Sequence, residues 1–396
     1  MRICFINQYF PPDASASAYL LGELAEDLAR HHQIVVIAGR PSYSVGSSTF
    51  SPTGVTVRYS WSTSFPRSSM PGRLVNYGSF LLGALIHAVF AGRPDVIVAL
   101  TDPPAIGLVG LMAARRHRVP FVYVCQDIFP DVAVALGKLR KQPLINLWQR
   151  LNALIRKEAS RVVVIGRDME EKLRREGVER SKLSLIRNWG FAPDVDAAAA
   201  RAERTKQGWD RRFIVMHAGN LGLAQNPAVL VQAASHLHES MPEMLLVFMG
   251  DGASRSRLER KVHREGLRNV VFLPYLPKEE AQRLMAAADL HVVSLASGLS
   301  GCVAPSKVYG IMAAGRPFIA SVEADSEPAL IAKEHECGIL AEPDDPHALA
   351  DAIVRARDLP LDELGRRGRD AFKRLYDRPI ATAAYRRLLE EVVRTG

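Results

Sequence analysis

The chain has 396 residues, of which 48% are hydrophobic and 23% are charged, and its formal net charge is +9. This is the composition of an ordinary globular protein, and at about 150 residues per domain the length predicts two domains. The four cysteines lie far apart, without the C-x-x-C spacing of a zinc site. They argue against a disulfide or zinc framework and favour a reduced, cytoplasmic protein.

The positive charge is spread along the chain rather than gathered in a tail. It includes Arg58, Arg93 and the basic run at residues 115–118. Basic proteins bind nucleic acid, anionic lipid or phosphorylated substrates, but this sequence carries no helix-turn-helix, zinc-finger or aromatic RNA-binding signature. Two interpretations stay open: a solvated basic surface, and a surface that faces anionic lipid.

One apolar stretch, LVNYGSFLLGALIHAVFAG at residues 74–92, is just long enough to span a bilayer. Asn76 and His87 interrupt it, and at the helical period they lie on one face. An apolar helix with one polar stripe is typical of a crossover helix packed on a sheet. We therefore expect a buried or interfacial helix rather than a membrane span. The opening MRICFIN predicts a strand and no signal peptide.

Apolar strand-like runs alternate with helical stretches along the whole chain. In the first half they are RICFIN, QIVVIAG, TVRYS, DVIVAL, FVYVCQD, RVVVIG and KLSLIRN; in the second half they are FIVMHAG, MLLVFMG, NVVFLP, LHVVSL, PFIAS and CGILAE. Nearly continuous apolar strands separated by helices indicate parallel sheets covered on both faces. The sequence therefore predicts an α/β fold of two Rossmann-like parallel-sheet domains that face each other across a cleft.

The alternation breaks at residues 191–212, which are rich in alanine and charge and contain no strand pattern. We expect the domain linker there, between a first domain at 1–190 and a second at 213–375. Residues 376–396 predict a separate C-terminal helix. Ligands bind at the carboxyl ends of parallel strands, so the chemistry is expected in the strand-to-helix loops.

Two loops of the second half hold glycines directly after a strand. HAGNLGLAQN carries Gly219 and Gly222, and MLLVFMGDG carries Gly250 and Asp251. Such glycines let the backbone approach a ligand closely. Each loop taken alone is equally consistent with an ordinary turn, in which Asp251 closes the turn through its own side chain.

The stretch SGCVAPSKVYGIMAAGRPF, from Ser300, is more specific. Pro305 and Ser306 predict a helix start with Ser306 as the N-cap, which puts Lys307 in the first turn. The helix dipole disfavours a cation there, so the lysine is best explained by an anion that the helix start and the ammonium hold together. The alternative is a lysine that simply faces solvent.

Strand ends of the first half carry a second set of polar residues. YFPPDASASAYL is a loop of small residues, including Ser15 and Ser17, that opens a helix. QDIFPD leaves Asp127 and Asp131 after a buried strand. These two carboxylates either orient an acceptor hydroxyl or, in the case of Asp131, cap the next helix.

These motifs, in this order and spacing, resemble glycosyltransferase family 4, the retaining sugar transferases of the GT-B fold. The resemblance runs nearly end to end, through YFPPD, QDIFPDVAVALG, IRNWG, HAGNLGLAQN, FMGDG, LPYLPKEE and PSKVYGIMAAGRP. It is strongest to the envelope-polysaccharide branch, that of colanic acid and O-antigen transferases of the L-fucosamine type.

The resemblance implies a function and places its residues. It implies transfer of a sugar, such as an N-acetylated hexosamine or a 6-deoxy variant, from a UDP-sugar to a lipid-linked or saccharide acceptor in the biosynthesis of exopolysaccharide, O-antigen or capsule. The enzyme would work without metal or other cofactor, in the cytoplasm on the inner face of the membrane. Donor-binding positions would be Gly219, Asn220, Gly222, Gln225, Gly250, Asp251, Tyr275, Leu276, Pro305, Ser306, Lys307 and Gly310, and acceptor-side positions Ser15, Ser17, Asp131 and Asn188. Asp127 and Lys307 would be catalytic, and the C-terminal helix would pack back on the first domain.

The sequence also departs from the family at charged positions. Asn220 and Gln225 stand where many members have the Arg and Lys that hold the diphosphate. Cys302 and Gly310 stand where many have two glutamates, and Gln126 replaces a histidine. Lys307 would therefore carry much of the diphosphate charge. Two alternatives stay open: a non-catalytic scaffold protein of the same fold, and a nucleotide-sugar epimerase.

Overall fold

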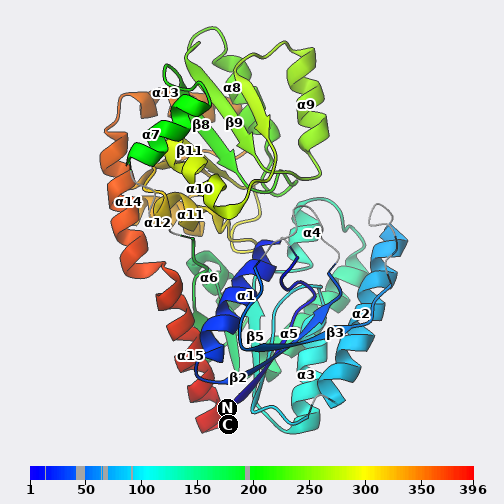
Figure 1. Ribbon diagram of the computed structural model, residues 1–396. Coiled ribbons are helices and arrows are strands. Elements are labelled where there is room, and N and C mark those ends of the chain that lie inside the picture. Colours follow the sequence, from blue (N-terminus) through cyan, green and yellow to red (C-terminus); the bar gives the residue numbers. More distant parts are fainter. Residues whose placement is uncertain (14, 42–49, 64, 66–69, 91, 192–196) are drawn as a thin grey trace. The chain divides into compact units, whose positions relative to one another are not determined.

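The computed structural model describes the chain except for residues 14, 42–49, 64, 66–69, 91 and 192–196 (Figure 1). The chain divides into two compact units. Unit 1 consists of Met1–Arg187 and Ala381–Gly396, and unit 2 consists of Asn188–Ile380.

Unit 1 is built on a seven-stranded sheet in the order β3-β2-β1-β4-β5-β6-β7. Every pairing in it is parallel. The strands are β1 (Arg2–Ile6), β2 (Gln33–Gly39), β3 (Val55–Ser60), β4 (Val96–Ala99), β5 (Phe121–Cys125), β6 (Arg161–Val164) and β7 (Leu183–Leu185). Central strands such as β4 and β5 are buried at every position, because helices cover both faces of a parallel sheet.

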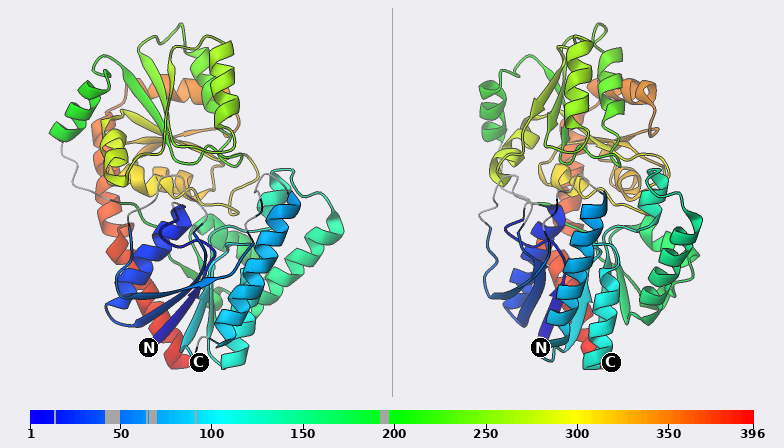
Figure 2. Two further views of the ribbon diagram at one scale, coloured as in Figure 1. Left: turned by 45° about the vertical axis from the view of Figure 1, so that its right-hand side comes forward. Right: turned by 90° about the vertical axis from the view of Figure 1, so that its right-hand side faces the viewer.

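The helices of unit 1 are α1 (Ala16–Ala29), α2 (Met70–Phe90), α3 (Ile106–His117), α4 (Asp131–Ala135), α5 (Gln142–Glu158), α6 (Arg167–Arg175) and α15 (Arg378–Thr395). On one face of the sheet α3 packs between α2 and α5. The opposite face carries α1 and the C-terminal helix α15 (Figure 2). Arg161 and His32 bind Glu391 and Glu390 of α15 at 3.0 and 3.1 Å, so the last helix belongs to the packing of unit 1.

Helix α2 is the apolar stretch that raised the question of a membrane span. It packs on β2, β3 and α3. Its polar residue Asn76 is buried and bonds to the backbone N–H and C=O of Phe65, both at 3.0 Å. These contacts confirm a crossover helix. Among the helices that the structure describes, none combines the length and apolar character needed to cross a bilayer.

Unit 2 is built on a six-stranded parallel sheet in the order β10-β9-β8-β11-β12-β13. Its strands are β8 (Phe213–Ala218), β9 (Met244–Met249), β10 (Val270–Leu273), β11 (Leu290–Ser294), β12 (Phe318–Ser321) and β13 (Gly338–Ala341). Its helices are α7 (Ala197–Lys206), α8 (Ala228–His236), α9 (Arg255–Arg264), α10 (Lys278–Ala287), α11 (Lys307–Ala313), α12 (Glu327–Glu334), α13 (Pro346–Arg357) and α14 (Leu361–Leu375). The two parallel-sheet units confirm the predicted α/β fold class.

The two sheets share one topological feature that places ligands. In each, the strand order reverses direction once, between β1 and β4 in unit 1 and between β8 and β11 in unit 2. Helices leave such a pair of strands toward opposite faces, which opens a crevice at their carboxyl ends. The residues that follow β1, β4, β8 and β11 are therefore the first candidates for a site.

The region predicted as linker, residues 191–212, differs from the expectation. Much of it is helix α7, which packs against α10 of unit 2. Arg204 of α7 binds both carboxylate oxygens of Asp289 at 3.0 and 3.1 Å. The alanines of this segment are strong helix formers, and this ion pair fastens the helix to the start of β11.

The boundary of the first domain also differs, because unit 2 begins at Asn188 rather than after 190. The cause is a close approach of two backbones. A Cβ on Gly190 would stand 2.6 Å from the carbonyl carbon and oxygen of Tyr309. Glycine is needed for this contact, which joins the segment Asn188–Gly190 to helix α11.

Candidate functional site

The glycine loops of unit 2 form one interlocked surface at the carboxyl edge of the sheet. The N–H of Gly219, after β8, donates to the carbonyl of Met249 at 2.8 Å. The N–H of Leu221 donates to the carbonyl of Asp251 at 2.8 Å. These bonds hold the loops after β8 and β9 together as a unit.

Gly250 and Gly252 are explained by this packing of loop on loop. They have φ angles of +145° and +157°, which side chains rarely adopt. A Cβ on Gly250 would stand 2.1 Å from the carbonyl oxygen of Gly219, and one on Gly252 would stand 2.6 Å from Oδ1 of Asn220. The GDG sequence is thus required by the loop contact, with or without a ligand.

Replacing Gly250 tests this packing. Gly250→Ala combines a strained φ with a backbone clash, and we expect it to destabilise unit 2 by about 3 kcal/mol or more. For a domain of this size the melting temperature should fall by roughly 6–12 °C in scanning calorimetry. The matched control is Gly310→Ala, where a Cβ meets only Met285 Cε at 3.6 Å and Gln282 Nε2 at 3.8 Å. In this helical position alanine should stabilise by about 0.5–1 kcal/mol. Equal melting temperatures for the two variants would contradict the loop packing.

Lys307 points back toward the end of β8 rather than out to solvent. Its Nζ lies 2.9 Å from Nε2 of His217, which is fully buried. Its Cε lies 3.9 Å from where a Cβ on Gly219 would be. Burial lowers the pKa of Lys307 to about 7. The alternative of a solvent-facing lysine is therefore wrong.

The predicted helix start is only partly as expected. Ser306 occupies the N-cap position of α11, but its backbone is helical and its side chain makes no capping hydrogen bond. Helix α11 has 7 residues, too short for its dipole to hold much charge. An anion at this place would therefore be held chiefly by Lys307, and less by Pro305, Ser306 and the helix start than expected.

The other predicted donor positions surround the same loops. Side-chain atoms of Asn220 and Gln225 each stand 2.8 Å from where a Cβ on Gly222 would be. Asp251 accepts a hydrogen bond from the N–H of Gly252 at 2.7 Å, so it closes its own turn. The hydroxyl of Tyr275 donates to the carbonyl of Asp251 at 3.4 Å. Leu276 follows in the same loop and is half-buried.

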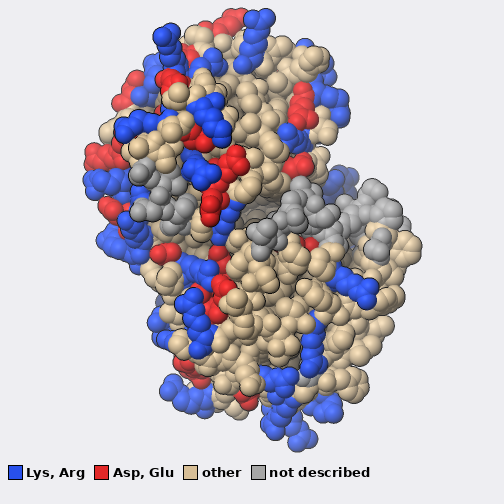
Figure 3. Space-filling model, in the orientation of Figure 1, with Lys and Arg blue, Asp and Glu red and all other residues tan. Residues whose placement is uncertain are grey.

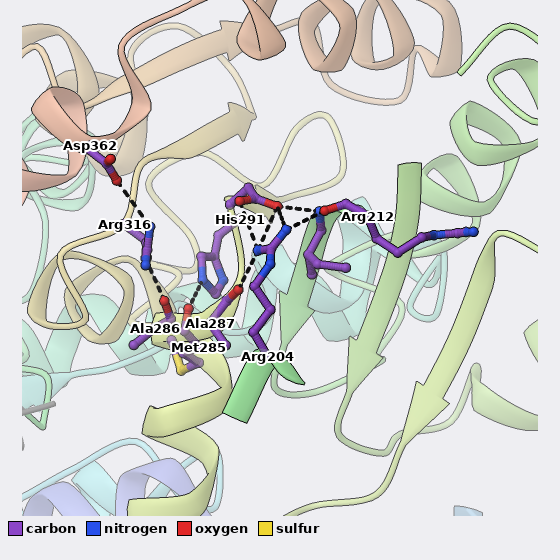
Figure 4. A network of polar contacts seen from close by, with 10 residues as sticks. Arg204, Arg212, Met285, Ala286, Ala287, His291, Arg316 and Asp362 are labelled. Carbon is purple, nitrogen blue, oxygen red and sulfur yellow. Dashed lines mark hydrogen bonds and ion pairs between the residues drawn. The ribbon is translucent and has the colours of Figure 1, made fainter. Parts of the chain in front are cut away.

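A polar network fixes strand β11 behind these loops (Figure 4). The carbonyls of Met285, Ala286 and Ala287, at the end of α10, bind His291 at 2.9 Å, Arg316 at 2.7 Å and Arg204 at 3.0 Å. Basic side chains at a helix C-terminus satisfy its free carbonyls and its dipole. His291 stays uncharged in this role, because burial lowers its pKa to about 4.

In unit 1 the polar residues that follow β1, β4 and β5 also meet. Ser15 caps α1 by accepting the N–H of Ala18 at 3.2 Å. Ser17 donates to Oδ2 of Asp102, after β4, at 3.1 Å. The hydroxyl of Thr101 accepts the N–H groups of Gln126 and Asp127 at 3.2 and 3.3 Å.

Asp127 and Asp102 are two carboxyl groups at this edge whose charged forms are disfavoured. Burial, and then the charge of Asp102, raise the pKa of Asp127 to about 7. Burial also raises the pKa of Asp102, although the Ser17 hydroxyl opposes the change. Asp127 lines a small cavity, and the polar and aromatic residues that line it as well include Thr101, Tyr123, Trp148, Asn152 and Arg156. In the described part of the chain no three His, Cys, Asp or Glu side chains gather as a metal site.

Two predicted acceptor-side residues lie elsewhere. Asp131 is the first residue of α4 and pairs with Lys172 of α6 at 3.5 Å, so its carboxylate joins two helices. Asn188 is buried and belongs to unit 2, because the backbone of Gly190 packs on α11.

Sequence reasoning missed two residues of these clusters. Asp102 lies two residues after the run DVIVAL, much as Asp127 ends the next run FVYVCQD, and the same signal would have found it. His217 is a polar residue near the end of the apolar strand FIVMHA, and such interruptions favour a buried polar contact.

Comparison with protein families matches both halves of the chain. Residues 16–189 match the glycosyl transferase 4-like domain, and residues 200–371 match the glycosyl transferases group 1. The chain therefore belongs to the glycosyltransferases that combine these two domains, and it is a glycosyltransferase.

Individual relatives agree. The chain is 28% identical over 344 residues to the probable glycosyltransferase WbjE of Pseudomonas aeruginosa, covering 83% of this chain and 84% of WbjE. It is 25% identical over 386 residues to the putative colanic acid biosynthesis glycosyl transferase WcaI of Escherichia coli, covering 91% and 93%. The crystal structure of Anabaena HepE in complex with UDP-glucose has a TM-score of 0.76 at 18% identity and covers 99% and 100%. These matches confirm the predicted family resemblance and the GT-B fold.

Proposed function

We propose that the chain is a retaining glycosyltransferase of envelope polysaccharide biosynthesis. It transfers a sugar from a UDP-sugar to a saccharide carried on a polyprenyl diphosphate. The observation that carries the proposal is Lys307, a half-buried cation at the glycine loops of unit 2 whose one hydrogen-bond partner in the described chain is a neutral histidine. A diphosphate would supply the negative charge that this lysine lacks.

The donor would bind at the carboxyl edge of unit 2. Gly219, where a Cβ would meet only Cε of Lys307 at 3.9 Å, leaves space for a diphosphate beside Lys307, and Tyr275 and Leu276 lie after β10 for a nucleobase. The likeness to HepE, whose structure is a complex with UDP-glucose, supports uridine as the base. The positive charge of Lys307 makes a metal unnecessary in this proposal.

The acceptor would bind beside Asp127, at the carboxyl edge of the sheet of unit 1. An ionised carboxylate only accepts hydrogen bonds. Asp127 would therefore orient the acceptor hydroxyl by accepting a hydrogen bond from it. Asp102 stands on the adjacent strand end.

The transfer would proceed on one face of the donor sugar. The bond between its anomeric carbon and the diphosphate oxygen breaks, and the acceptor oxygen bonds to the same carbon from the same side. The acceptor proton passes to the leaving diphosphate oxygen. Lys307 stabilises the charge that develops on that oxygen, and the protein contributes position and charge rather than a covalent intermediate.

The place in polysaccharide biosynthesis rests on the relatives. WcaI carries a name that refers to colanic acid biosynthesis, and the match extends over nine-tenths of both chains. We further propose that the enzyme is cytoplasmic and binds the inner face of the membrane, where a lipid-linked acceptor is available.

Helix α2 offers a surface for that membrane. Leu74, Leu82, Ile86 and Phe90 repeat at the helical period and are exposed by 64, 59, 51 and 77%. On the face shown in Figure 3 the surface of unit 1 is largely uncharged, with separate Lys and Arg side chains around it. Apolar side chains among basic ones suit an anionic lipid surface.

The double variant Leu82→Glu/Ile86→Glu tests this surface. Each buried side chain of this type contributes about 1.5–3 kcal/mol, so co-sedimentation with anionic phosphatidylglycerol vesicles at low salt should fall at least tenfold. The control is Leu375→Glu, an equally exposed leucine on α14 of unit 2. Helix α5 also exposes Leu144 and Leu147. If Leu144→Glu/Leu147→Glu alone abolished binding, the assignment to α2 would be wrong.

Calorimetric titration tests the proposed function itself. The purified protein is titrated with UDP, and with GDP as the control, in the presence of EDTA. We expect UDP to bind in the micromolar range and the heat to disappear in Lys307→Ala. Failure of both nucleotides to bind the wild-type protein would contradict a nucleotide-sugar transferase.

A further inference from the structure

Lys307 and His217 form a pair of basic side chains with no acidic partner. Nζ of Lys307 lies 2.9 Å from Nε2 of His217, and the histidine is fully buried near the end of β8. In the part of the chain that the structure describes, no carboxylate stands within ion-pair distance of the lysine. The hydrogen bond to the imidazole is the contact that fixes the position of Nζ.

Such a pair favours the uncharged forms of both residues. Burial without a counter-charge disfavours an ammonium and an imidazolium alike. The pKa of Lys307 is lowered to about 7 by burial, and that of His217 is lowered well below its usual range by burial and by the charge of Lys307. The hydrogen bond survives either state of the lysine, because amine and ammonium both carry N–H groups and neutral Nε2 accepts.

The titratable groups on the neighbouring elements are engaged elsewhere. His291 on β11 binds the carbonyl of Met285, and Arg316, before β12, binds Ala286 and Asp362. Asp251, after β9, binds the N–H of Gly252. The positive charge of Lys307 lowers the pKa of His291 further. Among the residues that the structure describes, the surroundings of the pair therefore contain no group that keeps the lysine charged by itself.

We propose that His217 is the positioning residue for Lys307, and that a diphosphate bound at this pair draws one proton onto Lys307. The proton comes from solvent and adds to the free electron pair on Nζ, and no bond of the ligand breaks. The negative diphosphate favours the ammonium form, while His217 holds Nζ in place beside Gly219 both before and after. The inference rests on the proposed function, because it takes a diphosphate as the ligand.

Calorimetry in buffers of different ionisation enthalpy measures the proton directly. At pH 8 the terminal phosphate of UDP is already ionised, since its second pKa is about 6. A lysine with a pKa of about 7 is then about nine-tenths neutral, so we expect uptake of about 0.9 proton per UDP. The dissociation constant should rise about ninefold from pH 8 to pH 9. UDP binding without proton uptake would overturn the proposal.

Variants of His217 test its positioning role. His217→Phe keeps the ring but removes the acceptor, and should weaken UDP binding about tenfold while proton uptake continues. His217→Gln restores an acceptor and should recover most of the affinity. The control is His291→Phe on the adjacent strand, which loses a bond to the end of α10 and should keep UDP affinity within twofold below its melting temperature. Wild-type affinity in His217→Phe, or an equal loss in His291→Phe, would refute the role.

A titration without nucleotide separates this proposal from the proposed function. Competitive acetylation with acetic anhydride, read by mass spectrometry over a range of pH, reports the protonation midpoint of Lys307. We expect a midpoint near pH 7 that inorganic diphosphate raises by two units or more. A midpoint near the ordinary value of 10.5 overturns the proposal. If neither UDP nor GDP binds, the proposed function fails, and this midpoint still decides the inference.

Discussion

Lys307→Ala should lower turnover by at least a hundredfold. A group that stabilises charge on the leaving oxygen contributes about 2–4 kcal/mol to the transition state, and Lys307 is the cation that the structure directs at the glycine loops. The measurement is the rate of UDP release from the UDP-sugar that the wild-type enzyme uses fastest. Lys333→Ala, on the exposed side of α12, is the matched control and should turn over normally.

The fold should not suffer from the loss of this lysine. Its pKa of about 7 in the fold lies below the ordinary 10.5, so folding disfavours the charged form. The lysine therefore costs stability at every pH below about 10.5, and the full cost is present below about 7. Lys307→Ala should melt at or above the wild-type temperature at pH 7. Near-normal turnover in this variant would exclude the proposed role of Lys307, whereas a lower melting temperature would indicate a structural role.

The strands and the parallel α/β class of both units were accessible from the sequence, because buried parallel strands are short apolar runs. DVIVAL and MLLVFMG appear as β4 and β9 with little change. The linker assignment of segment 191–212 was not correct, since a polar helix that is fastened by packing on α10 and by the ion pair of Arg204 with Asp289 has the composition of a linker. Tertiary contacts, not local pattern, decide such a helix.

The loops that form the candidate site were predictable from the sequence, but the hydrogen bonds between their residues were not. The sequence placed Lys307 at an anion site, because a lysine in the first turn of the helix after Pro305 is best explained by a bound anion. In the structure this lysine points to the glycine loops. Its partner His217 lies ninety residues earlier, a distance over which single-sequence patterns carry no pairing information. The glycines of GDG were expected to approach a ligand, yet Gly250 is required by the carbonyl of Gly219 and Gly252 by Asn220 and the backbone of Leu221.

Asp127→Asn should lower turnover by about 10²-fold, the cost of misplacing a reacting group by about 1 Å. The substitution keeps the shape of the side chain and removes the charge that would accept the acceptor hydroxyl. Because burial and Asp102 raise the pKa of Asp127 to about 7, the carboxyl is protonated below pH 7 and ionised above it. Wild-type turnover should therefore rise with pH through about 7, and Asp127→Asn should lose this rise.

The profile must be measured at saturating donor, so that Lys307 is already charged and does not contribute its own titration. Asp102→Asn removes the second cause of the raised pKa and should move the midpoint of the rise to lower pH. The control is Asp95→Asn. Asp95 lies at the opposite edge of the same sheet and accepts a hydrogen bond from the N–H of Arg2. A wild-type profile that is flat between pH 6 and 8, or a midpoint that stays in place in Asp102→Asn, would show that the carboxyl pair does not orient the acceptor. A shift of the midpoint in Asp102→Asn would assign the pH dependence of turnover to the ionisation of Asp127, whose backbone Thr101 holds.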